Sequence, residues 1–127
     1  MNLSDQQYLF AKDVIRLLSY IRDDEEISKF SIGEVWRPLE WQEILHKRGF
    51  SQTLDSDHLN KMAVDIYFWI DGRFIKNIWE NKPLLSEIGE YWVELNDHNY
   101  WGGHFKTLCD LNHFGRKRLY DAIDDTD

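Results

Sequence analysis

The most constraining feature of the sequence is the apolar segment Ala63–Ile70, which reads AVDIYFWI. Its β-branched and aromatic residues predict a strand, and the Asp71-Gly72 pair that follows predicts a tight hairpin with a return strand over Arg73–Ile75. Successive side chains of a strand point to opposite faces, so Asp65 lies on the face opposite its two apolar neighbours. A carboxylate in such a segment is costly to bury unless it is paired or binds a metal. The segment therefore predicts both a strand and a residue that needs a partner.

The rest of the chain predicts helices and strands that are segregated rather than strictly alternating. Ser4 and Gln7 have the spacing of a capping box, and apolar residues then recur at helical intervals. The further predicted elements are a helix over Ser4–Ile21, a strand over Ile27–Arg37, a helix over Leu39–Lys47, a helix over Pro83–Leu95 and a strand over Asn112–Phe114. We therefore expect one domain over residues 1–127 in the α+β class, with a small antiparallel sheet and flanking helices.

The charge balance and the cysteine count exclude several classes of protein. With 23 acidic and 15 basic residues the formal net charge is −8, which disfavours binding to nucleic acid or to an anionic membrane surface. No apolar run is long enough for membrane insertion, and the first residues lack the pattern of a signal peptide, so we expect synthesis in the cytoplasm. A single cysteine, Cys109, excludes an internal disulfide and a cysteine-rich zinc finger. It does not exclude zinc, because His and Asp are also zinc ligands.

Two short clusters of His and Asp are candidates for a metal site. His58 precedes Asp65 by seven residues, and Asp110 precedes His113 by three. Histidine together with carboxylate is the ligand set of a catalytic zinc, which keeps one position for water. Each cluster alone also fits a simpler interpretation: Asp65 as an edge-strand residue that contacts water, and Asp110 and His113 as a surface Asp with a half-buried His. The residues alone leave both interpretations open.

The two clusters stand in the order of the motifs of a known family. The stretch SDHLNKMAVD resembles the S-x-H-x(6)-D signature of zinc peptidases that cut peptidoglycan stem peptides, and CDLNHF resembles their D/E-x-x-H element. The segment WGGHF resembles their W-G-G segment, and FSIGEVWRPLEWQ resembles the G-E-x-x-R-T-x-x-Q segment of short phage-type members. Most of the chain thus resembles the VanY-like family of zinc D-Ala-D-Ala carboxypeptidases and L-alanyl-D-glutamate endopeptidases. The resemblance implies a Hedgehog/DD-peptidase-like zinc peptidase fold.

The resemblance assigns roles residue by residue. His58, Asp65 and His113 match the three ligands of Zn²⁺. Asp110 matches the catalytic residue that acts as general base and then as general acid. Arg37 matches the catalytic arginine that stabilises the developing oxyanion or holds the substrate.

Other matched positions are less closely tied to the chemistry. Ser56 matches the signature Ser, and we place it with Arg37 and Trp101 among the expected substrate-binding residues. Gln42 matches the Gln of its segment and receives no role. The usual Gly three residues after the first His is Lys61 here, which puts the local turn in question more than the metal. The remaining histidines and the cysteine are interpreted as non-ligands: His46, His98, His104 and Cys109.

The residues and the resemblance together predict metal-assisted hydrolysis of an amide bond in a peptidoglycan stem peptide. The expected protein is a phage-type endolysin, an L-alanyl-D-glutamate endopeptidase that acts as a monomer on the cell wall after holin-type release. Two alternatives stay open: a D-Ala-D-Ala carboxypeptidase of the same family, and a non-catalytic wall-binding module that retains the fold. The two enzymes use the same ligands, so the sequence does not choose between their bonds.

Overall fold

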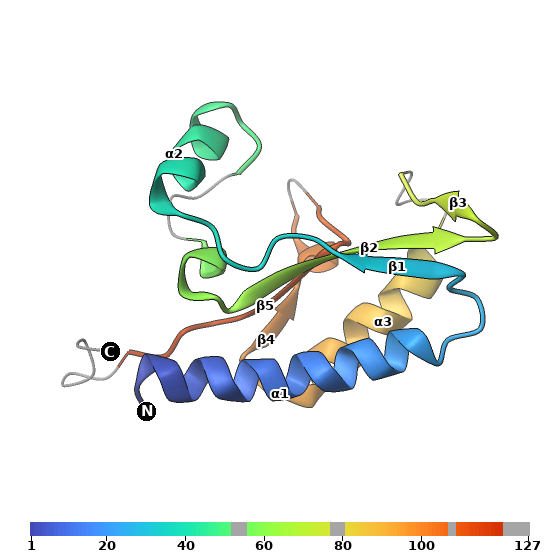
Figure 1. The fold of residues 1–127 in the computed structure, drawn as a ribbon, viewed down its shortest axis with the longest axis horizontal. Coiled ribbons are helices and arrows are strands. Elements are labelled where there is room, and N and C mark those ends of the chain that lie inside the picture. The colour runs from blue at the N-terminus through green and yellow to red at the C-terminus, as the bar shows by residue number, and fades with distance from the viewer. Residues whose placement is uncertain (52–55, 77–80, 107–108, 121–127) are drawn as a thin grey trace.

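The computed structural model describes residues 1–51, 56–76, 81–106 and 109–120. Its architecture is α+β, as the sequence predicts (Figure 1). The elements are, in chain order, α1 (Leu3–Arg22), β1 (Lys29–Ile32), α2 (Leu39–Lys47), the short helix η1 (Asp57–Asn60), β2 (Ala63–Ile70), β3 (Arg73–Phe74), α3 (Lys82–Leu95), β4 (Asn99–Trp101), the short helix η2 (Gly102–His104) and β5 (His113–Arg116). No helix in these described ranges is long and apolar enough to cross a membrane.

The sheet is antiparallel and is built around the long strand β2. Its strand order is β1-β2-β5-β4, and β3 also pairs with β2. Asp65 is held on both sides, because its backbone N–H donates to Glu34, its carbonyl accepts from Gly33, and it stands opposite His113 of β5. The interpretation of Asp65 as a residue of an edge strand is therefore wrong.

Helices α1 and α3 cover one face of the sheet, and α2 lies beyond the opposite face (Figure 1). Alternate residues of β2, namely Val64, Ile66 and Phe68, belong to the buried core. The helices and β5 supply core residues that face them: Phe10, Leu17, Ile21, Leu85, Ile88, Trp92 and Phe114. Full burial of one such side chain contributes about 1.5–3 kcal/mol. This packing points Asp65 to the other face of the sheet, where the candidate site lies.

A buried polar group fastens α1 to the end of the sheet that carries β4 and β5. Asp13 of α1 accepts a hydrogen bond from the side-chain amide of Asn99 at 3.2 Å. The guanidinium of Arg116 in β5 lies 3.5 Å from the same carboxylate oxygen. All three residues are buried, so the charges compensate one another inside the protein. This contact helps to fix the strand that begins at His113.

Three local features complete the comparison with the sequence. The N-cap of α1 is Asn2, which accepts from the Asp5 N–H at 2.9 Å, so the predicted capping box at Ser4 is wrong. The predicted hairpin is confirmed: Asp71 and Gly72 have φ of 52° and 75°, as a type I′ turn requires. Strand β4 was not predicted, because three residues are too few to show an alternating pattern.

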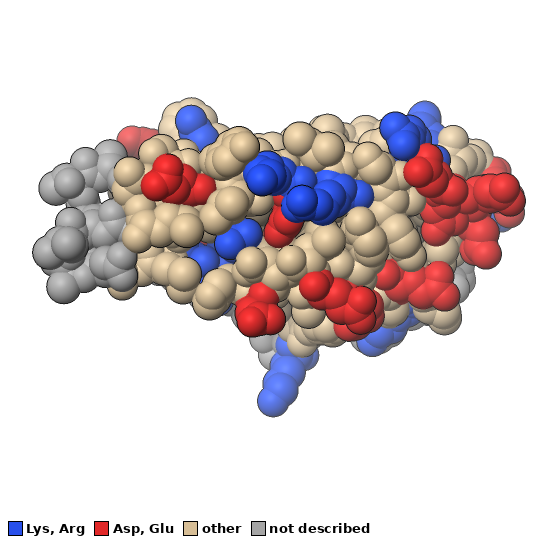
Figure 2. All heavy atoms as spheres, turned by 90° about the horizontal axis from the view of Figure 1, so that it is seen from below, with Lys and Arg blue, Asp and Glu red and all other residues tan. Residues whose placement is uncertain are grey.

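The outer face of the helices carries charges of both signs. Figure 2 shows this face, with acidic side chains gathered at the end of the molecule where α1 ends. The acidic run Asp23–Glu26 follows α1 at that point, and three of its four side chains are exposed. This cluster of negative charge thus lies at the far end of the helical face, beyond the C-terminus of α1.

Candidate metal centre and its pocket

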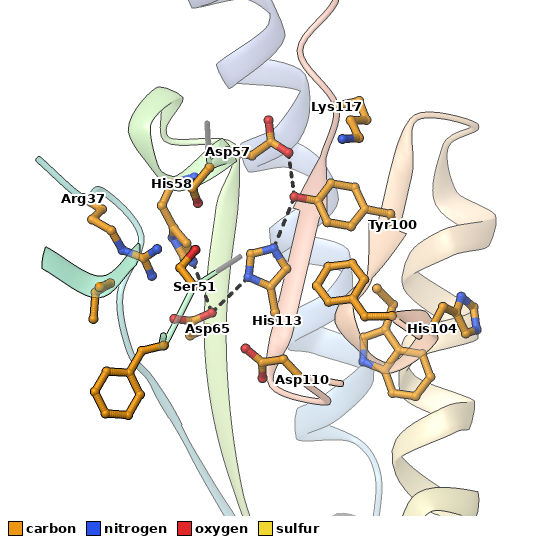
Figure 3. Close-up of a pocket in the computed structure, with 15 residues that line it drawn as sticks. Arg37, Ser51, Asp57, His58, Asp65, Tyr100, His104, Asp110, His113 and Lys117 are labelled. Carbon is orange, nitrogen blue, oxygen red and sulfur yellow. Dashed lines mark hydrogen bonds and ion pairs between the residues drawn. The ribbon is translucent and has the colours of Figure 1, made fainter. Parts of the chain in front are cut away.

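Three side chains with metal-ligating atoms converge where η1, β2 and β5 meet (Figure 3). Asp65 and His113 are paired residues of β2 and β5, and His58 comes from η1. The Oδ1 atom of Asp65 lies 3.2 Å from Nε2 of His58 and 3.4 Å from Nδ1 of His113. The three ligand atoms all lie within 4.8 Å of one another. The two clusters of the sequence thus form one group.

The ring of His58 is oriented by groups on its far side. Ser56 caps η1 by accepting a hydrogen bond from the His58 N–H at 3.2 Å. Nδ1 of His58 lies 2.8 Å from the carbonyl oxygen of Val35. A carbonyl only accepts, so Nδ1 carries the proton and, in the neutral ring, Nε2 directs its lone pair at Asp65. Lys61 ends η1 in the left-handed conformation with φ of 58°, so the turn in question forms with Lys in place of Gly.

The charges of the three groups depend on one another. Burial alone would raise the pKa of Asp65, but its contacts with the imidazoles of His113 and His58, when these rings are protonated, outweigh burial and hold that pKa at about 2. Burial lowers the pKa of His58, whereas the hydrogen bond and the charge of Asp65 raise it, and the net shift is upward. The Asp65 carboxylate is therefore an anion at neutral pH that attracts a cation.

The chemistry of this donor set fits zinc. Two imidazole nitrogens and one carboxylate oxygen are ligands of a catalytic zinc site. In the neutral state, a lone pair of His58 faces the carboxylate of Asp65, and two acceptors at 3.2 Å require a proton or a metal ion between them. His58 is 1% exposed, so bulk water does not separate the two groups. The residues His58, Asp65 and His113 are thus suited to hold a zinc ion.

Asp110 lies beside this group, in the turn that leads into β5. Its Oδ1 accepts a hydrogen bond from the Asn112 N–H at 3.0 Å, and the carboxylate is turned toward Asp65 (Figure 3). Burial and the negative charge of Asp65 raise the pKa of Asp110, so it accepts a proton more readily than a surface carboxylate. A Cβ atom on Gly102 would collide with the carbonyl of Asp110. Gly102, which follows Trp101 in the W-G-G-type segment, therefore lets the backbone of the Asp110 turn approach closely.

Arg37 forms the opposite wall of the site. Its Nε pairs with Glu34, and its Nη1 donates to Oε1 of Gln42 at 2.6 Å. Gln42 is fully buried and donates in turn to Oγ of Ser51 at 2.9 Å. The backbone N–H of Arg37 donates to the carbonyl of His58 at 3.1 Å, which ties this wall to η1. Gln42, which the sequence left without a role, thus orients the guanidinium.

Trp101 is a buried residue of the pocket wall. It is 1% exposed, and its Nε1 donates to the carbonyl of Leu111 at 3.0 Å. A Cβ atom on Gly89 or on Gly103 would collide with the indole ring, so the ring fills the space that these two glycines leave. Trp101 thus packs in the pocket wall, and its contact with a substrate stays a prediction. Ser56 is also buried, with its hydroxyl used to cap η1.

The metal-ligating group opens into a pocket of about 550 Å³. Its lining also includes two exposed aromatic side chains, Phe50 and Phe105, and Lys117. Pockets of this size and mixed polarity are typical of small-molecule and peptide sites. His104 lies at the rim, exposed and 2.6 Å from a carboxylate oxygen of Glu90, and points away from the ligand group (Figure 3).

Two further residues lie beside the group: Tyr100 of β4 contacts His113, and Asp57 of η1 contacts Tyr100. The Tyr100 hydroxyl lies 2.6 Å from Oδ2 of Asp57 and 3.2 Å from Nε2 of His113. Burial and the negative charge of Asp57 raise the pKa of Tyr100, so the hydroxyl keeps its proton at neutral pH. Asp57 adjoins His58 in the sequence, but no pattern there links it to a tyrosine 43 residues away.

The other candidate residues stay outside the ligand group. His46 and His98 are exposed, as predicted. Cys109 is half-buried, and its Sγ donates to the carbonyl of Gly103 at 3.4 Å. Within the described ranges, the group His58, Asp65 and His113 is the one set of three side chains able to hold a metal ion together.

Comparison with known proteins identifies a structural neighbour. No protein-family model matches the chain, and no curated protein matches it in sequence. The crystal structure of the L-Ala D-Glu endopeptidase ChiX of Serratia marcescens is similar, with a TM-score of 0.65 and 27% sequence identity. The match covers 84% of this chain and 79% of ChiX. The predicted fold class is thus confirmed: the chain has the α+β fold of this peptidase.

Proposed function

We propose that the protein is a zinc-dependent peptidase that hydrolyses the bond between L-Ala and D-Glu in peptidoglycan stem peptides. The observation that carries the proposal is the convergence of His58, Asp65 and His113 in a pocket that also holds Asp110 and Arg37. The likeness to an L-Ala D-Glu endopeptidase supports a peptidase in general and this bond in particular. The pocket lining, which is partly aromatic and partly charged, suits a peptide with apolar and acidic residues.

His58, Asp65 and His113 would hold the zinc ion. When bound, zinc polarises the carbonyl of the scissile amide and lowers the pKa of water at the site. Asp110 then takes a proton from the attacking water and delivers it to the leaving amine nitrogen, a task that its raised pKa favours. The guanidinium of Arg37, held by Glu34 and Gln42, offers positive charge to the oxygen that becomes negative during the attack.

The setting of this reaction follows from the family resemblance. The short phage-type segment around Arg37 supports an endolysin that acts on the cell wall as a monomer. With a net charge of −8, such an enzyme does not rely on overall charge to find an anionic wall. Substrate binding is therefore a property of the pocket itself.

The test is digestion of purified peptidoglycan with zinc-loaded protein, followed by mass spectrometry of the fragments. The proposal expects new L-Ala carboxyl ends and new D-Glu amino ends. Loss of terminal D-Ala alone would assign the protein to the carboxypeptidases and overturn the choice of bond. No cleavage, with retained binding to the wall, would assign it to the non-catalytic modules and overturn the proposal.

Asp110→Asn is the critical variant for this test. It keeps the size of the side chain but removes the base, so we expect a folded protein that binds zinc and loses activity by at least about 100-fold. Asp97→Asn, at an exposed turn position, is the matched control and should retain full activity.

A further inference from the structure

We infer that Tyr100 and Asp57 are positioning residues that set the metal affinity of the site by fixing the tautomer of His113. The inference rests on the proposed function in one respect, because it takes Nδ1 of His113 as a zinc-ligating atom. The two residues belong to elements that pack on either side of the ligand: Tyr100 to β4 and Asp57 to η1. Figure 3 shows the tyrosine hydroxyl between the Asp57 carboxylate and the His113 ring.

The first step is to locate the hydroxyl proton of Tyr100. The Asp57 carboxylate only accepts hydrogen bonds, and it lies 2.6 Å from the hydroxyl oxygen, a distance typical of a charge-assisted O–H···O bond. A hydroxyl has a single proton, so that proton points at Asp57. Toward His113, 3.2 Å away on the other side, the hydroxyl therefore presents an acceptor lone pair.

The second step follows for the ring of His113. Both ring nitrogens face an acceptor, but Nε2 is hydrogen-bonded to the hydroxyl at 3.2 Å, whereas Nδ1 lies 3.4 Å from the Asp65 carboxylate. The hydrogen bond therefore favours the proton on Nε2 and leaves the lone pair of Nδ1 directed at Asp65. The other histidine is oriented from its opposite nitrogen, because Nδ1 of His58 donates to a carbonyl and Nε2 faces Asp65. Both rings thus present a lone pair to the same point. A hydrogen bond to the non-ligating nitrogen is the usual device that fixes a metal-binding imidazole.

A glycine in β5 makes room for this arrangement. Tyr100 stands opposite Gly115 in the β4–β5 pair, and a Cβ atom on Gly115 would collide with the tyrosine ring and its hydroxyl. Glycine weakens a strand interior, so its presence there indicates a close approach by another group. The tyrosine backbone is also fixed, because its carbonyl accepts from Nε1 of Trp92 at 3.0 Å. The hydroxyl is therefore held at its site by the strand pairing rather than by the metal.

Asp57 has a distinct part in this chain of hydrogen bonds. Without its carboxylate, the Tyr100 hydroxyl is free to rotate and donate to Nε2 of His113, which moves the imidazole proton to Nδ1. That tautomer blocks the nitrogen that faces Asp65. Removal of Asp57 should therefore weaken zinc binding at least as much as removal of the tyrosine hydroxyl.

The experiment compares Tyr100→Phe, Asp57→Ala and the double variant in two measurements. Zinc affinity is determined by competition with a chromophoric chelator, and the His113 tautomer is determined by ¹⁵N NMR of the metal-free protein at about pH 8. We expect Tyr100→Phe to weaken zinc binding about 10- to 100-fold and to give mixed tautomers. Asp57→Ala should weaken it to the same extent or more and enrich the Nδ1–H form. Adding Asp57→Ala to Tyr100→Phe should cost nothing further, because the hydroxyl that Asp57 orients is absent.

Tyr91→Phe is the matched control, because this tyrosine stacks on Tyr20 at the surface of the helices and should keep wild-type affinity. Wild-type affinity and an unchanged tautomer in Tyr100→Phe would overturn the inference, as would additive losses in the double variant. The NMR measurement needs no metal. A wild-type protein that shows the Nε2–H form but binds no zinc would therefore overturn the proposed function while supporting the hydrogen-bond chain.

Discussion

The two walls of the pocket are built in different ways. The wall that carries His58, Asp65 and His113, here called the metal wall, is part of the sheet and of η1. The side chains of these three residues are at most 13% exposed. The wall that carries Arg37, here called the arginine wall, leads into α2, where Gln42 is the one buried residue. Most apolar side chains of α2 are exposed, namely Leu39, Trp41 and Ile44, and so is Phe50, three residues after the helix. Figure 1 shows α2 standing apart from the other helices.

The difference suits the proposed division of tasks, in which one wall holds an ion and the other contacts a substrate. A metal site needs ligand atoms at fixed separations, and paired strands over an apolar core supply them. The arginine wall is held by the polar chain Glu34–Arg37–Gln42–Ser51 rather than by apolar packing. Elements with few buried apolar contacts open at lower free-energy cost. We therefore expect the metal wall to be rigid and the arginine wall to adapt.

The largest expected effect comes from removing a ligand of the metal wall. His58→Ala should abolish stoichiometric zinc binding. The loss of affinity should exceed about 100-fold, the upper range for mutation of a residue that only supports a ligand. Zinc content by elemental mass spectrometry after dialysis measures this loss. His46→Ala, on the exposed surface of α2, is the control. Retention of zinc by His58→Ala would break the assignment of the metal wall.

The arginine wall should affect rate without affecting metal. Arg37→Ala should lower kcat/KM by about 100- to 1000-fold, the usual loss for one oxyanion donor, with zinc content unchanged. Steady-state hydrolysis of a stem-peptide substrate, measured beside zinc content, separates the two quantities. Arg48→Ala, an exposed arginine just after α2, should leave both unchanged. A parallel loss of zinc in Arg37→Ala would show that the walls are one unit.

Hydrogen exchange compares the two walls directly. Backbone amides of α2 should exchange at least about 10-fold faster than those of α3, which buries Leu85, Ile88, Gly89 and Trp92. Mass spectrometry of peptides from the labelled protein resolves the two helices. Equal protection would contradict an adaptable arginine wall.

The metal wall should respond to pH in opposite ways with and without zinc. Asp65 raises the pKa of His58 in the folded metal-free protein. This stabilisation is fully present below the unfolded His pKa of about 6.5 and is lost as pH rises through the folded value. Zinc needs the neutral ring, so its stabilisation grows as pH rises. In calorimetry, excess zinc should therefore raise Tm more at about pH 8 than at about pH 5.5. Excess Mg²⁺ should not raise Tm at either pH.

The smallest effect concerns the turn beside the metal wall. Lys61 adopts φ of 58°, which is costly for a residue with a Cβ atom, so Lys61→Gly should stabilise the protein by about 1 kcal/mol. Urea unfolding measures this gain. Glu43→Gly, at an exposed position in the middle of α2, should destabilise by a similar amount because glycine weakens a helix interior. A loss of stability in Lys61→Gly would show that the lysine side chain contributes more than its backbone strain costs.

Much of the fold follows from the sequence, since long periodic segments such as Leu3–Arg22 and Ala63–Ile70 determine their own secondary structure. The strand Asn99–Trp101 does not, because pairing with β5 rather than its own pattern makes it a strand. The pairing of Asp65 with His113 is a matter of register, on which local sequence is silent. There the motif resemblance supplied the prediction.

The contacts that the sequence does not reveal share one physical cause. Trp101 looks like a groove aromatic until the glycines on either side of its ring are placed in space. Tyr100 and Asp57 meet only because β4 and η1 flank the same strand end. Such contacts join distant parts of the chain, and a list of residue types and spacings does not contain them.

The alternation along β2 has a consequence for how the chain finds its structure. Its apolar residues face the two helices and its carboxylate faces the histidines, so each face of the strand requires its own kind of side chain. A slip of one residue would carry the Asp65 carboxylate into the apolar layer and Val64 or Ile66 into the polar one, and both exchanges are unfavourable. Asp65 thus helps to specify the register of β2. The strand that fails to build the ion site also fails to build the core.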